Sequence, residues 1–253
     1  MVEARQAAEE GDIPVVMSGD GLVGQVGGAL AETDGVMGIL PGGRGNDLAR
    51  VLGIPSDPAG AVAVLAAGKE RRIDVGQAND RRFLGVASCG FDSECNQLAN
   101  ETHLVKGNLV YAYSAIRVLA SWRAARFTVV LDGGSPIEFE GYSVAAANSR
   151  AFGGGMFIAP HAALDDGMLD VITISDVSKL RYIRGLPKAF KGTHLENDEV
   201  TEHRAATVEI SADRDFAVFA DGEHLTDLPA TLGVLPAALR VVAPPGSLVG
   251  PPS

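Results

Sequence analysis

The chain has 253 residues, a formal charge of −11 and 46% hydrophobic residues, so it can bury a substantial core and is not of the disordered class. Its acidity argues against nucleic acid as a partner, because the phosphates would repel such a surface over long range. Its apolar runs are each too short to cross a bilayer and no charged-then-apolar leader opens the chain, so we expect a soluble, cytoplasmic protein. The spacing of Cys89 and Cys95 suits neither a zinc knuckle nor a redox pair, and we expect buried, unreactive thiols.

Two strand–turn–helix units open the chain. Residues 13–17 predict a short strand, residues 18–21 a glycine-rich turn, and residues 22–32 a helix. Residues 35–40 then predict a second strand, followed by a turn and by a helix that ends at Leu52 and has Asn46 or Asp47 as its N-cap. This order predicts an α/β N-terminal domain.

From about residue 82 the pattern changes to strands separated by turn residues, which predicts a mostly β second domain. The predicted strands are residues 83–87, 127–131, 142–147, 169–174, 207–210 and 216–220. Helices are predicted at residues 109–122 and 178–191. We therefore divide the chain into residues 1–75, residues 76–243, and a flexible tail rich in Pro and Gly at residues 244–253.

Residues 19–24 fit the G-x-G-x-x-G pattern of a dinucleotide-binding turn, which is a weak signal when it stands alone. An acidic residue should end the next strand and hold a ribose, yet that strand ends with Leu40 and Pro41. The sequence therefore disfavours NAD binding.

The two glycine-rich turns together are a better candidate for a phosphate site. Each follows a strand and precedes a helix, so both should lie at the carboxyl edge of a parallel sheet, where free N–H groups and helix dipoles attract phosphate. The alternative is that they are tight turns with Asx caps, but an Asp in each turn favours phosphate binding through a divalent cation. The candidate phosphate-binding residues are Ser18, Gly19, Asp20, Gly21, Gly43, Arg44, Gly45, Asn46 and Asp47.

These turns resemble the signatures of one enzyme family. Residues 16–22, VMSGDGL, resemble the G-G-D-G-T signature of diacylglycerol kinase catalytic domains, and residues 40–50, LPGGRGNDLAR, resemble their P-x-G-T-G-N-D-x-A-R signature. The resemblance continues, in the family's order, through residues 72–76, 90–92, 153–156, 164–170 and 220–223. It implies a first domain like that of 6-phosphofructokinase and NAD kinase, a β-sandwich second domain that takes the lipid, and ATP with Mg²⁺ between them.

The chain departs from the family pattern in three places. The family's opening strand and helix, with an N-P-x-x-G phosphate-contact motif, have no counterpart, so we expect an incomplete nucleotide-binding domain over residues 1–75. Leu22 and Arg44 stand where the two signatures have Thr. The guanidinium of Arg44 could hold a phosphate oxygen, or it could simply be exposed to solvent.

The resemblance also implies roles for individual acidic residues. Asp20, Asp47 and Asp74 match the family's acidic trio near the ATP-bound Mg²⁺, although Asp74 could instead end a strand at the domain boundary. Glu223 matches the proposed general base, although its Asp-Gly-Glu setting is also typical of a hairpin tip. We expect Glu223, Asp20 and Asp74 to be the catalytic residues.

A separate structural cation is a further expectation. The carboxylate of Asp166 and the backbone carbonyls of Ala163 and Met168 would supply the oxygen ligands that hard cations favour. A simple Asp-Gly turn before the strand at Leu169 is the alternative.

The resemblance favours an ATP-dependent lipid kinase that phosphorylates a lipid hydroxyl, with diacylglycerol giving phosphatidic acid as the leading case. Two alternatives stay open: a small-molecule kinase of the NAD kinase type, and a non-catalytic nucleotide- or lipid-binding module. Five basic residues between Lys179 and Lys191, with no acid among them, could approach an anionic membrane or form an ordinary solvated helix face. We therefore expect a cytoplasmic protein that binds ATP and its lipid, with peripheral contact at the inner membrane face and a homodimer as the expected oligomer.

Overall fold

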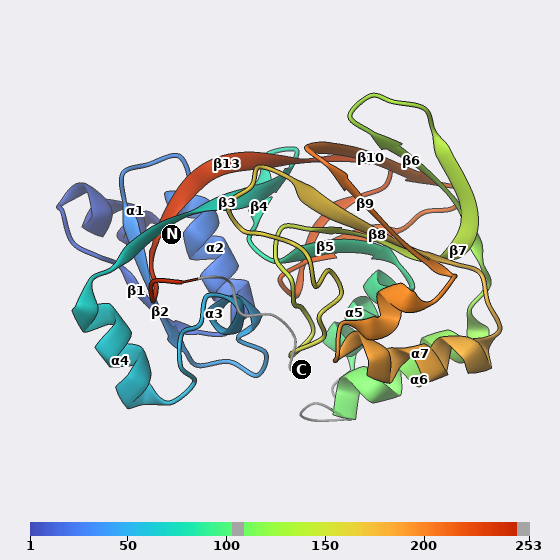
Figure 1. The fold of residues 1–253 in the computed structure, drawn as a ribbon, viewed down its shortest axis with the longest axis horizontal. Helices are drawn as coiled ribbons and strands as arrows, with labels where there is room; N and C mark the ends of the chain where they lie inside the picture. Colours follow the sequence, from blue (N-terminus) through green and yellow to red (C-terminus); the bar gives the residue numbers. More distant parts are fainter. Residues whose placement is uncertain (103–108, 247–253) are drawn as a thin grey trace.

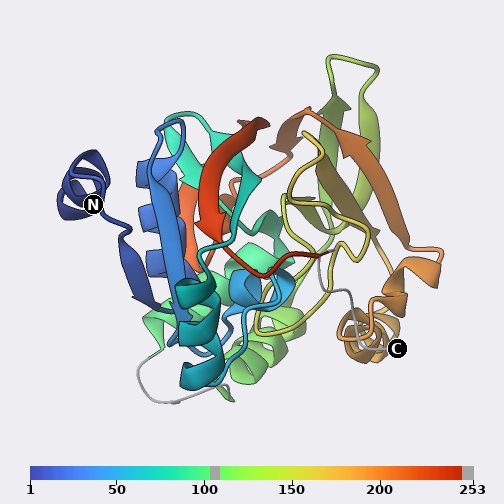
Figure 2. The same cartoon turned by 60° about the vertical axis from the view of Figure 1, so that its left-hand side comes forward.

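The computed structural model describes residues 1–102 and 109–246, in which an α/β region continues into a mostly antiparallel β region (Figure 1). The first elements are α1 (Val2–Glu9), β1 (Val15–Ser18), α2 (Asp20–Leu30), β2 (Val36–Pro41), α3 (Asp47–Val51) and α4 (Pro58–Ala67). β1 and β2 pair in parallel, with Val15 opposite Gly38, and Figure 2 shows α2 and α4 on opposite sides of them. The two predicted strand–turn–helix units are confirmed.

The second region is a network of antiparallel strands. Its elements are β3 (Glu70–Ala78), β4 (Arg81–Phe83), β5 (Val86–Gly90), α5 (Phe91–Glu101), α6 (Leu109–Ser121), β6 (Ala125–Leu131), β7 (Ile137–Ala147), β8 (Leu169–Ser175), α7 (Lys179–Ala189), the 3₁₀ helix η1 (Thr193–Glu196), β9 (Val200–Ala205), β10 (Thr207–Ala212), β11 (Ala217–Ala220), β12 (Glu223–Asp227) and β13 (Ala230–Val242). The strand order is β1-β2-β13-β10-β6-β7-β5-β11-β12, with β3 on β13 and β8 on β7. The predicted fold class is confirmed.

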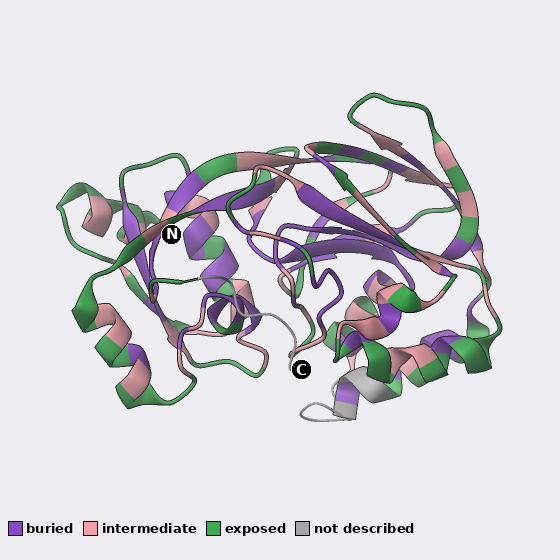
Figure 3. Cartoon of the chain, in the orientation of Figure 1, coloured by how far each residue is buried: buried purple, intermediate pink, exposed green. Residues whose placement is uncertain are grey.

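Two main cores stabilise these regions (Figure 3). The first packs Val23, Val26 and Leu30 of α2 against the strands, and it includes Leu239 of β13, which returns from the end of the chain to pair with β2. The second is rich in aromatic rings, which are those of Phe83, Phe91, Trp122, Phe127, Tyr142, Tyr182 and Phe216. β13 contributes Leu239 to the first core and Leu232 to the second, so the first core draws on both ends of the chain. The domain boundary at residue 75 stays a prediction.

Several elements were absent from the sequence prediction, among them α4, β3, α5, β9 and β13. The predicted strand over residues 83–87 is also wrong in its continuity, because β4 ends at Phe83 and β5 begins at Val86. The reason is a tertiary contact: the N–H groups of Leu84 and Gly85 donate to the carboxylate of Asp221 instead of to a neighbouring strand.

Both cysteines are free thiols. Cys89 is buried and Cys95 half-buried, and burial raises the pKa of Cys89 to about 12, so this thiol is unreactive. Within residues 1–102 and 109–246, no helix has the length and apolar character needed to cross a membrane. Of the predicted tail, residues 247–253 lie outside the described residues.

Candidate active site

The two glycine-rich turns lie in direct backbone contact. A Cβ atom at Gly43 would be 2.2 Å from the Cα atom of Gly19, and one at Gly19 would be 3.1 Å from the Cα atom of Gly43. The first distance is too short for a side chain at position 43, and the second would be tight, so glycine at position 43 is required for this approach. The turns meet because β1 and β2 are parallel neighbours and both end at the same edge, and the N–H of Gly42 donates to the carbonyl of Ser18 (3.0 Å).

The two turns bring Asp20 and Asp47 together beside Gly45. A Cβ atom at Gly45 would lie 2.8 Å from Asp20 Oδ2 and 3.1 Å from Asp47 Oδ2. The other Asp20 oxygen, Oδ1, accepts a hydrogen bond from the N–H of Leu48 (3.2 Å) in the first turn of α3. Asp20 therefore links the start of α2 to the start of α3, and glycine at position 45 leaves the space that both carboxylates occupy.

Asp47 is buried in a setting that leaves one oxygen free of hydrogen bonds. Its Oδ2 accepts from the N–H of Gly154 (2.7 Å), whereas Oδ1 has no hydrogen-bond partner in the described part of the chain and lies 3.7 Å from Arg50 Nε. Burial raises the pKa of Asp47 above its ordinary value, and the charge of Asp20 raises it further, while the Gly154 hydrogen bond and Arg50 lower it. A buried carboxylate oxygen that accepts no hydrogen bond and lies beside a second carboxylate fits a divalent cation.

The remaining residues of the second turn are held in different ways. Asn46 adopts a left-handed conformation (φ 52°), and its side chain accepts from the N–H of Gly43 (2.8 Å) and donates to the carbonyl of Gly43 (3.0 Å). Arg50 donates to the carbonyl of Gly45 (3.1 Å), and Arg44 is exposed to solvent. Asn46 and Arg50 thus fix the shape of the turn, whereas Arg44, within the turn, is exposed to solvent.

Glu223 is carried to these turns by a hairpin. Between β11 and β12, Asp221 (φ 53°) and Gly222 (φ 84°) both have positive φ, as the two-residue hairpin turn of type I′ requires. The hairpin tip lies against the start of α2, where a Cβ atom at Gly21 would be 3.4 Å from the Asp221 carbonyl oxygen and 3.5 Å from Glu223 Oε1. Glu223 is therefore both at a hairpin tip and beside the first glycine-rich turn.

Asp221 is a site residue that the sequence prediction missed. Its carboxylate accepts from the N–H groups of Leu84 (2.8 Å) and Gly85 (2.9 Å), and a Cβ atom at Gly24 would lie 2.7 Å from its Oδ2. Burial raises the pKa of Asp221 to about 7, and the nearby carboxylates of Asp20 and Asp47 add to the rise, against the two backbone hydrogen bonds. The Asp-Gly turn in the sequence was the available signal, but it indicates only the hairpin.

The glycine loop at residues 153–155 is a second feature that the prediction left without a role. Its three glycines all have positive φ (65°, 85° and 108°), which allows the loop to present backbone N–H groups to Asp47. Arg50 lies next to it, with Cζ 3.8 Å from a Cβ atom placed at Gly155. Three consecutive glycines were a visible signal for such a loop.

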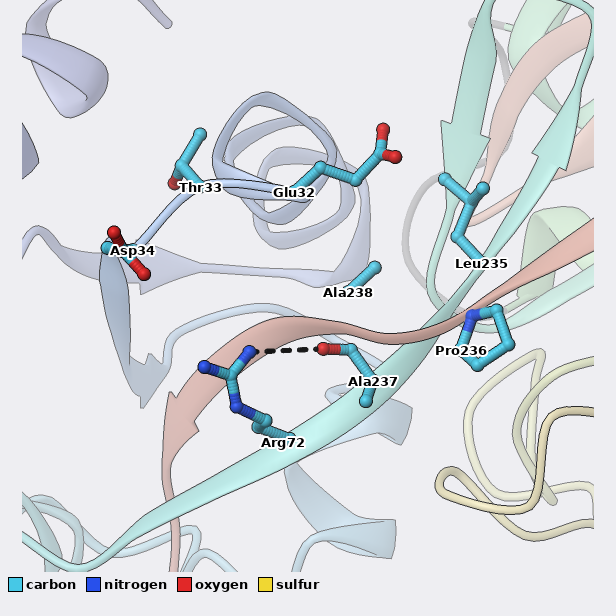
Figure 4. Close-up of a pocket in the computed structure, with 8 residues that line it drawn as sticks. All are labelled: Glu32, Thr33, Asp34, Arg72, Leu235, Pro236, Ala237 and Ala238. Atoms are coloured by element: carbon cyan, nitrogen blue, oxygen red, sulfur yellow. Dashed lines mark hydrogen bonds between the residues drawn. The ribbon is translucent and has the colours of Figure 1, made fainter.

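A cavity of about 680 Å³ opens beside the hairpin tip. Its wall combines Gly21 and Gly24 of α2 with Asp221, Glu223 and several basic and amide side chains, which are Arg5, Gln25, Gln77, Asn79, Arg81 and Arg82. A second cavity, of about 400 Å³, lies over the irregular part of β13 and is shown in Figure 4. None of the predicted site residues lines this second cavity, and Arg72 donates to the carbonyl of Ala237 across it (3.4 Å).

Asp74 has a setting different from that of Asp20 and Asp47. It is buried in the middle of β3, so it does not end a strand, and its two carboxylate oxygens accept from the N–H groups of Gly167 (2.7 Å) and Ala237 (2.6 Å). No hydrogen bond or ion pair among the described residues joins it to the other two acids. Asp74 holds together three distant segments: β3, the loop before β8 and the bulge of β13.

In the loop predicted to bind a cation, the carboxylate of Asp166 is paired with the guanidinium of Arg204. The carboxylate of Asp166 accepts from the N–H of Met168 (3.1 Å) and is ion-paired with Arg204, which also lies 3.7 Å from the buried Asp170. Burial raises the pKa of Asp170 to about 6, against the charge of Arg204. Over residues 1–102 and 109–246, no three His, Cys, Asp or Glu side chains form a group suited to a metal ion. Ligation by Ala163, Asp166 and Met168 stays a prediction.

Known protein families and curated relatives match this chain over most of its length. The chain matches the diacylglycerol kinase catalytic domain over residues 2–78 and the YegS C-terminal NAD kinase beta sandwich-like domain over residues 85–243. A diacylglycerol kinase of Mycobacterium tuberculosis (strain H37Rv) is 36% identical over 247 residues, covering 95% of this chain and 80% of the relative. The diacylglycerol kinase of Bacillus subtilis (strain 168) is 30% identical over 250 residues, covering 95% and 81%.

A solved structure shows the same fold. The crystal structure of a diacylglycerol kinase from Bacillus anthracis superposes with a TM-score of 0.73 at 21% identity, covering 96% of this chain and 80% of that one. A catalytic domain followed by this sandwich domain defines a lipid kinase. The chain belongs to the diacylglycerol kinase family, and the resemblance drawn from its two glycine-rich turns is confirmed.

Proposed function

We propose that this lipid kinase transfers the γ-phosphoryl group of ATP to the free hydroxyl of diacylglycerol and so produces phosphatidic acid. The observation that carries the proposal is the position of Glu223, which reaches the first glycine-rich turn from the β-rich region. A phosphoryl donor held by the turns and an acceptor held by the β-rich region would then meet next to a carboxylate. The names of the curated relatives support the choice of lipid.

The two turns are suited to hold the phosphates of ATP. Phosphoryl transfer depends on positioning and on neutralising charge, and backbone N–H groups at helix starts provide both without a bulky side chain. The cation that accompanies ATP is commonly held by one or two protein carboxylates together with phosphate oxygens and water. Asp20 and the free Oδ1 of Asp47 fit this role, and bound Mg²⁺ would neutralise phosphate charge there.

Glu223 is the proposed general base. In the transfer, the lipid oxygen forms a bond to the γ-phosphorus, the bond from that phosphorus to the β–γ bridging oxygen breaks, and ADP leaves with the electron pair. The proton of the lipid hydroxyl passes to the Glu223 carboxylate, which is exposed and therefore accessible to that hydroxyl. In this proposal Asp221 fixes the hairpin that carries Glu223. Asp74 fixes the loop before β8 and the bulge of β13.

The test is Glu223→Gln, which keeps the shape of the side chain and removes its ability to accept a proton. We expect turnover with diacylglycerol in mixed micelles and Mg-ATP to fall by roughly 10²–10⁴-fold. ATP binding, measured by calorimetry, should stay close to that of the unaltered protein. Glu209→Gln on β10 is the matched control, because Glu209 is exposed and should tolerate the same change. Full activity of Glu223→Gln would refute the assignment.

A further inference from the structure

Helix α7 exposes apolar side chains that a solvated helix would normally bury. Tyr182 and Ala189 face the core, whereas Leu180 and Ile183 on the opposite side are 58% and 47% exposed, and Phe190, just beyond the helix, is 47% exposed. At a helical spacing of about 100° per residue, Leu180 and Ile183 lie on one outward-facing stripe. Exposing this apolar stripe to water is energetically unfavourable.

Helix α6 also exposes apolar side chains. Its outward residues Tyr113 and Ile116 are 37% and 69% exposed, and they lie one turn apart. The ammonium of Lys179, at the start of α7, donates to the carbonyl of Ala120 in α6 (2.8 Å), which ties the two helices together. Both lie at the end of the molecule away from α4 (Figure 1). We call Tyr113, Ile116, Leu180, Ile183 and Phe190, with Arg184 and Lys191, the α6–α7 face.

The charge of α7 has the sign opposite to that of the whole protein. Residues 179–191 contain five basic residues and no acid, although the formal charge of the chain is −11. Arg181 pairs with Glu199, and Lys188 donates to Asn197, so both are engaged with the protein itself. Within the described residues, the side chains of Arg184 and Lys191 have no hydrogen-bond or ion-pair partner, and both residues are exposed.

We propose that the α6–α7 face docks on an anionic lipid bilayer; this inference rests on the proposed lipid substrate, which resides in such a bilayer. Exposed apolar side chains next to unpaired basic groups are the pattern of helices that lie in the membrane interface, where rings and aliphatic chains enter the acyl boundary and cations meet lipid phosphates. An acidic protein would be repelled by anionic lipid elsewhere on its surface, so the basic helix orients the encounter. The face would hold the kinase where its acceptor lies.

The test is flotation of the full chain with vesicles, either of phosphatidylcholine alone or of an equimolar mixture with phosphatidylglycerol. We expect binding to the mixed vesicles, and weaker binding at high salt. Two double variants of the face are compared with two matched controls elsewhere. The face variants are Leu180→Ser with Ile183→Ser and Arg184→Glu with Lys191→Glu; the controls are Val2→Ser with Val62→Ser and Lys69→Glu with Arg126→Glu.

Reversing two charges on the face should weaken binding to anionic vesicles by on the order of 20-fold or more, at roughly fivefold for each basic residue lost. The control variants carry the same changes at exposed positions and should bind like the unaltered protein. Equal loss in the face and control variants would refute the proposal. So would conversion of a dimer to a monomer by Leu180→Ser with Ile183→Ser, measured by light scattering, with vesicle binding unchanged.

Kinase assays separate this inference from the proposed function. With diacylglycerol in detergent micelles the face variants should keep full activity, and with diacylglycerol in anionic vesicles they should lose it in proportion to binding. A chain that floats with vesicles but phosphorylates no diacylglycerol would refute the function and leave the docking face standing. A chain that phosphorylates diacylglycerol in micelles but binds no vesicle would refute the docking face and leave the proposed function standing.

Discussion

Replacing Gly45 by alanine tests whether the meeting of Asp20 and Asp47 matters for nucleotide use. The position does not have positive φ, so alanine is compatible with the backbone, and the added methyl group is the whole perturbation. That methyl would lie 2.8 Å from Asp20 Oδ2, which is closer than a real contact allows, and 3.1 Å from Asp47 Oδ2, which is a tight contact. At least one carboxylate must therefore move.

The expected size of the effect follows from what holds the carboxylates. Asp20 accepts from Leu48 N–H and Asp47 from Gly154 N–H, and losing one hydrogen bond to a charged group costs about 1.5–3 kcal/mol. A displacement of about 1 Å in a group that positions a reactant costs roughly 100-fold in rate. We expect kcat/KM for Mg-ATP to fall by about 100-fold, measured with diacylglycerol in mixed micelles, while the protein stays folded at room temperature.

Gly233→Ala is the control for this variant. Gly233 also lacks positive φ, and a Cβ atom there would lie 3.8 Å from its nearest neighbour, the Ala206 carbonyl oxygen, which is an ordinary contact. Its stability and activity should change little. Unaltered kcat/KM for Gly45→Ala, or an equal loss in Gly233→Ala, would show that the packing of the two carboxylates is not what supports activity.

Two further predictions concern the other acids. Asp74→Ala leaves the N–H groups of Gly167 and Ala237 without their acceptor, and each unsatisfied donor costs about 1–3 kcal/mol of stability. Urea denaturation should therefore show a large loss in the free energy of unfolding. A small loss would mean that water replaces the carboxylate. For Asp221, the pKa in the folded protein is raised to about 7 from an ordinary 3.8, so this group favours the folded state in acid and loses that contribution as the pH rises through 7. The free energy of unfolding of the unaltered protein minus that of Asp221→Asn should therefore fall between pH 5 and pH 8, and a constant or rising difference would contradict the raised pKa.

The sequence was most informative where local chemistry alone decides the structure. Gly19 and Gly43 follow short apolar strands and precede helices, and parallel strands in a sheet must place such turns at one edge. For the same reason the order β1, α2, β2, α3 could be predicted. The aspartates at positions 20 and 47 were visible as residues that simple turns do not need.

Elements whose stability comes from distant contacts were missed. Helix α5 begins at Phe91 after the N-cap Gly90, which has φ 94° and provides no side-chain cap, so the helix lacks a start signal in the sequence. Strand β13 contains Pro236 within a bulge, a pattern that argues against a central strand when read alone. Its place is set by pairing with β2, β3 and β10, which lie far away in sequence.

Asp221 shows why the candidate site could not be completed from the sequence. In the sequence it is the first residue of an Asp-Gly turn, and that pattern predicts a hairpin. Its carboxylate instead accepts from two N–H groups some 136 residues earlier, interrupts the strand predicted there, and fits against a helix that has glycine at position 24. Only the tertiary structure brings these segments together.

The electrostatics of the assembled site give the strongest argument for a cation-bearing ligand. Burial raises the pKa values of Asp47 and Asp221, and the nearby charge of Asp20 raises both further, while Asp47 adds to the rise at Asp221. Backbone N–H groups from the glycine loop and from the β4–β5 connection stabilise these carboxylates only in part, because Asp47 Oδ1 has no hydrogen-bond partner among the described residues. Gathering like charges costs folding stability, and a positive ion bound between them would remove that cost. Under the proposed function, the raised pKa values and an affinity for Mg-ATP should therefore have the same origin.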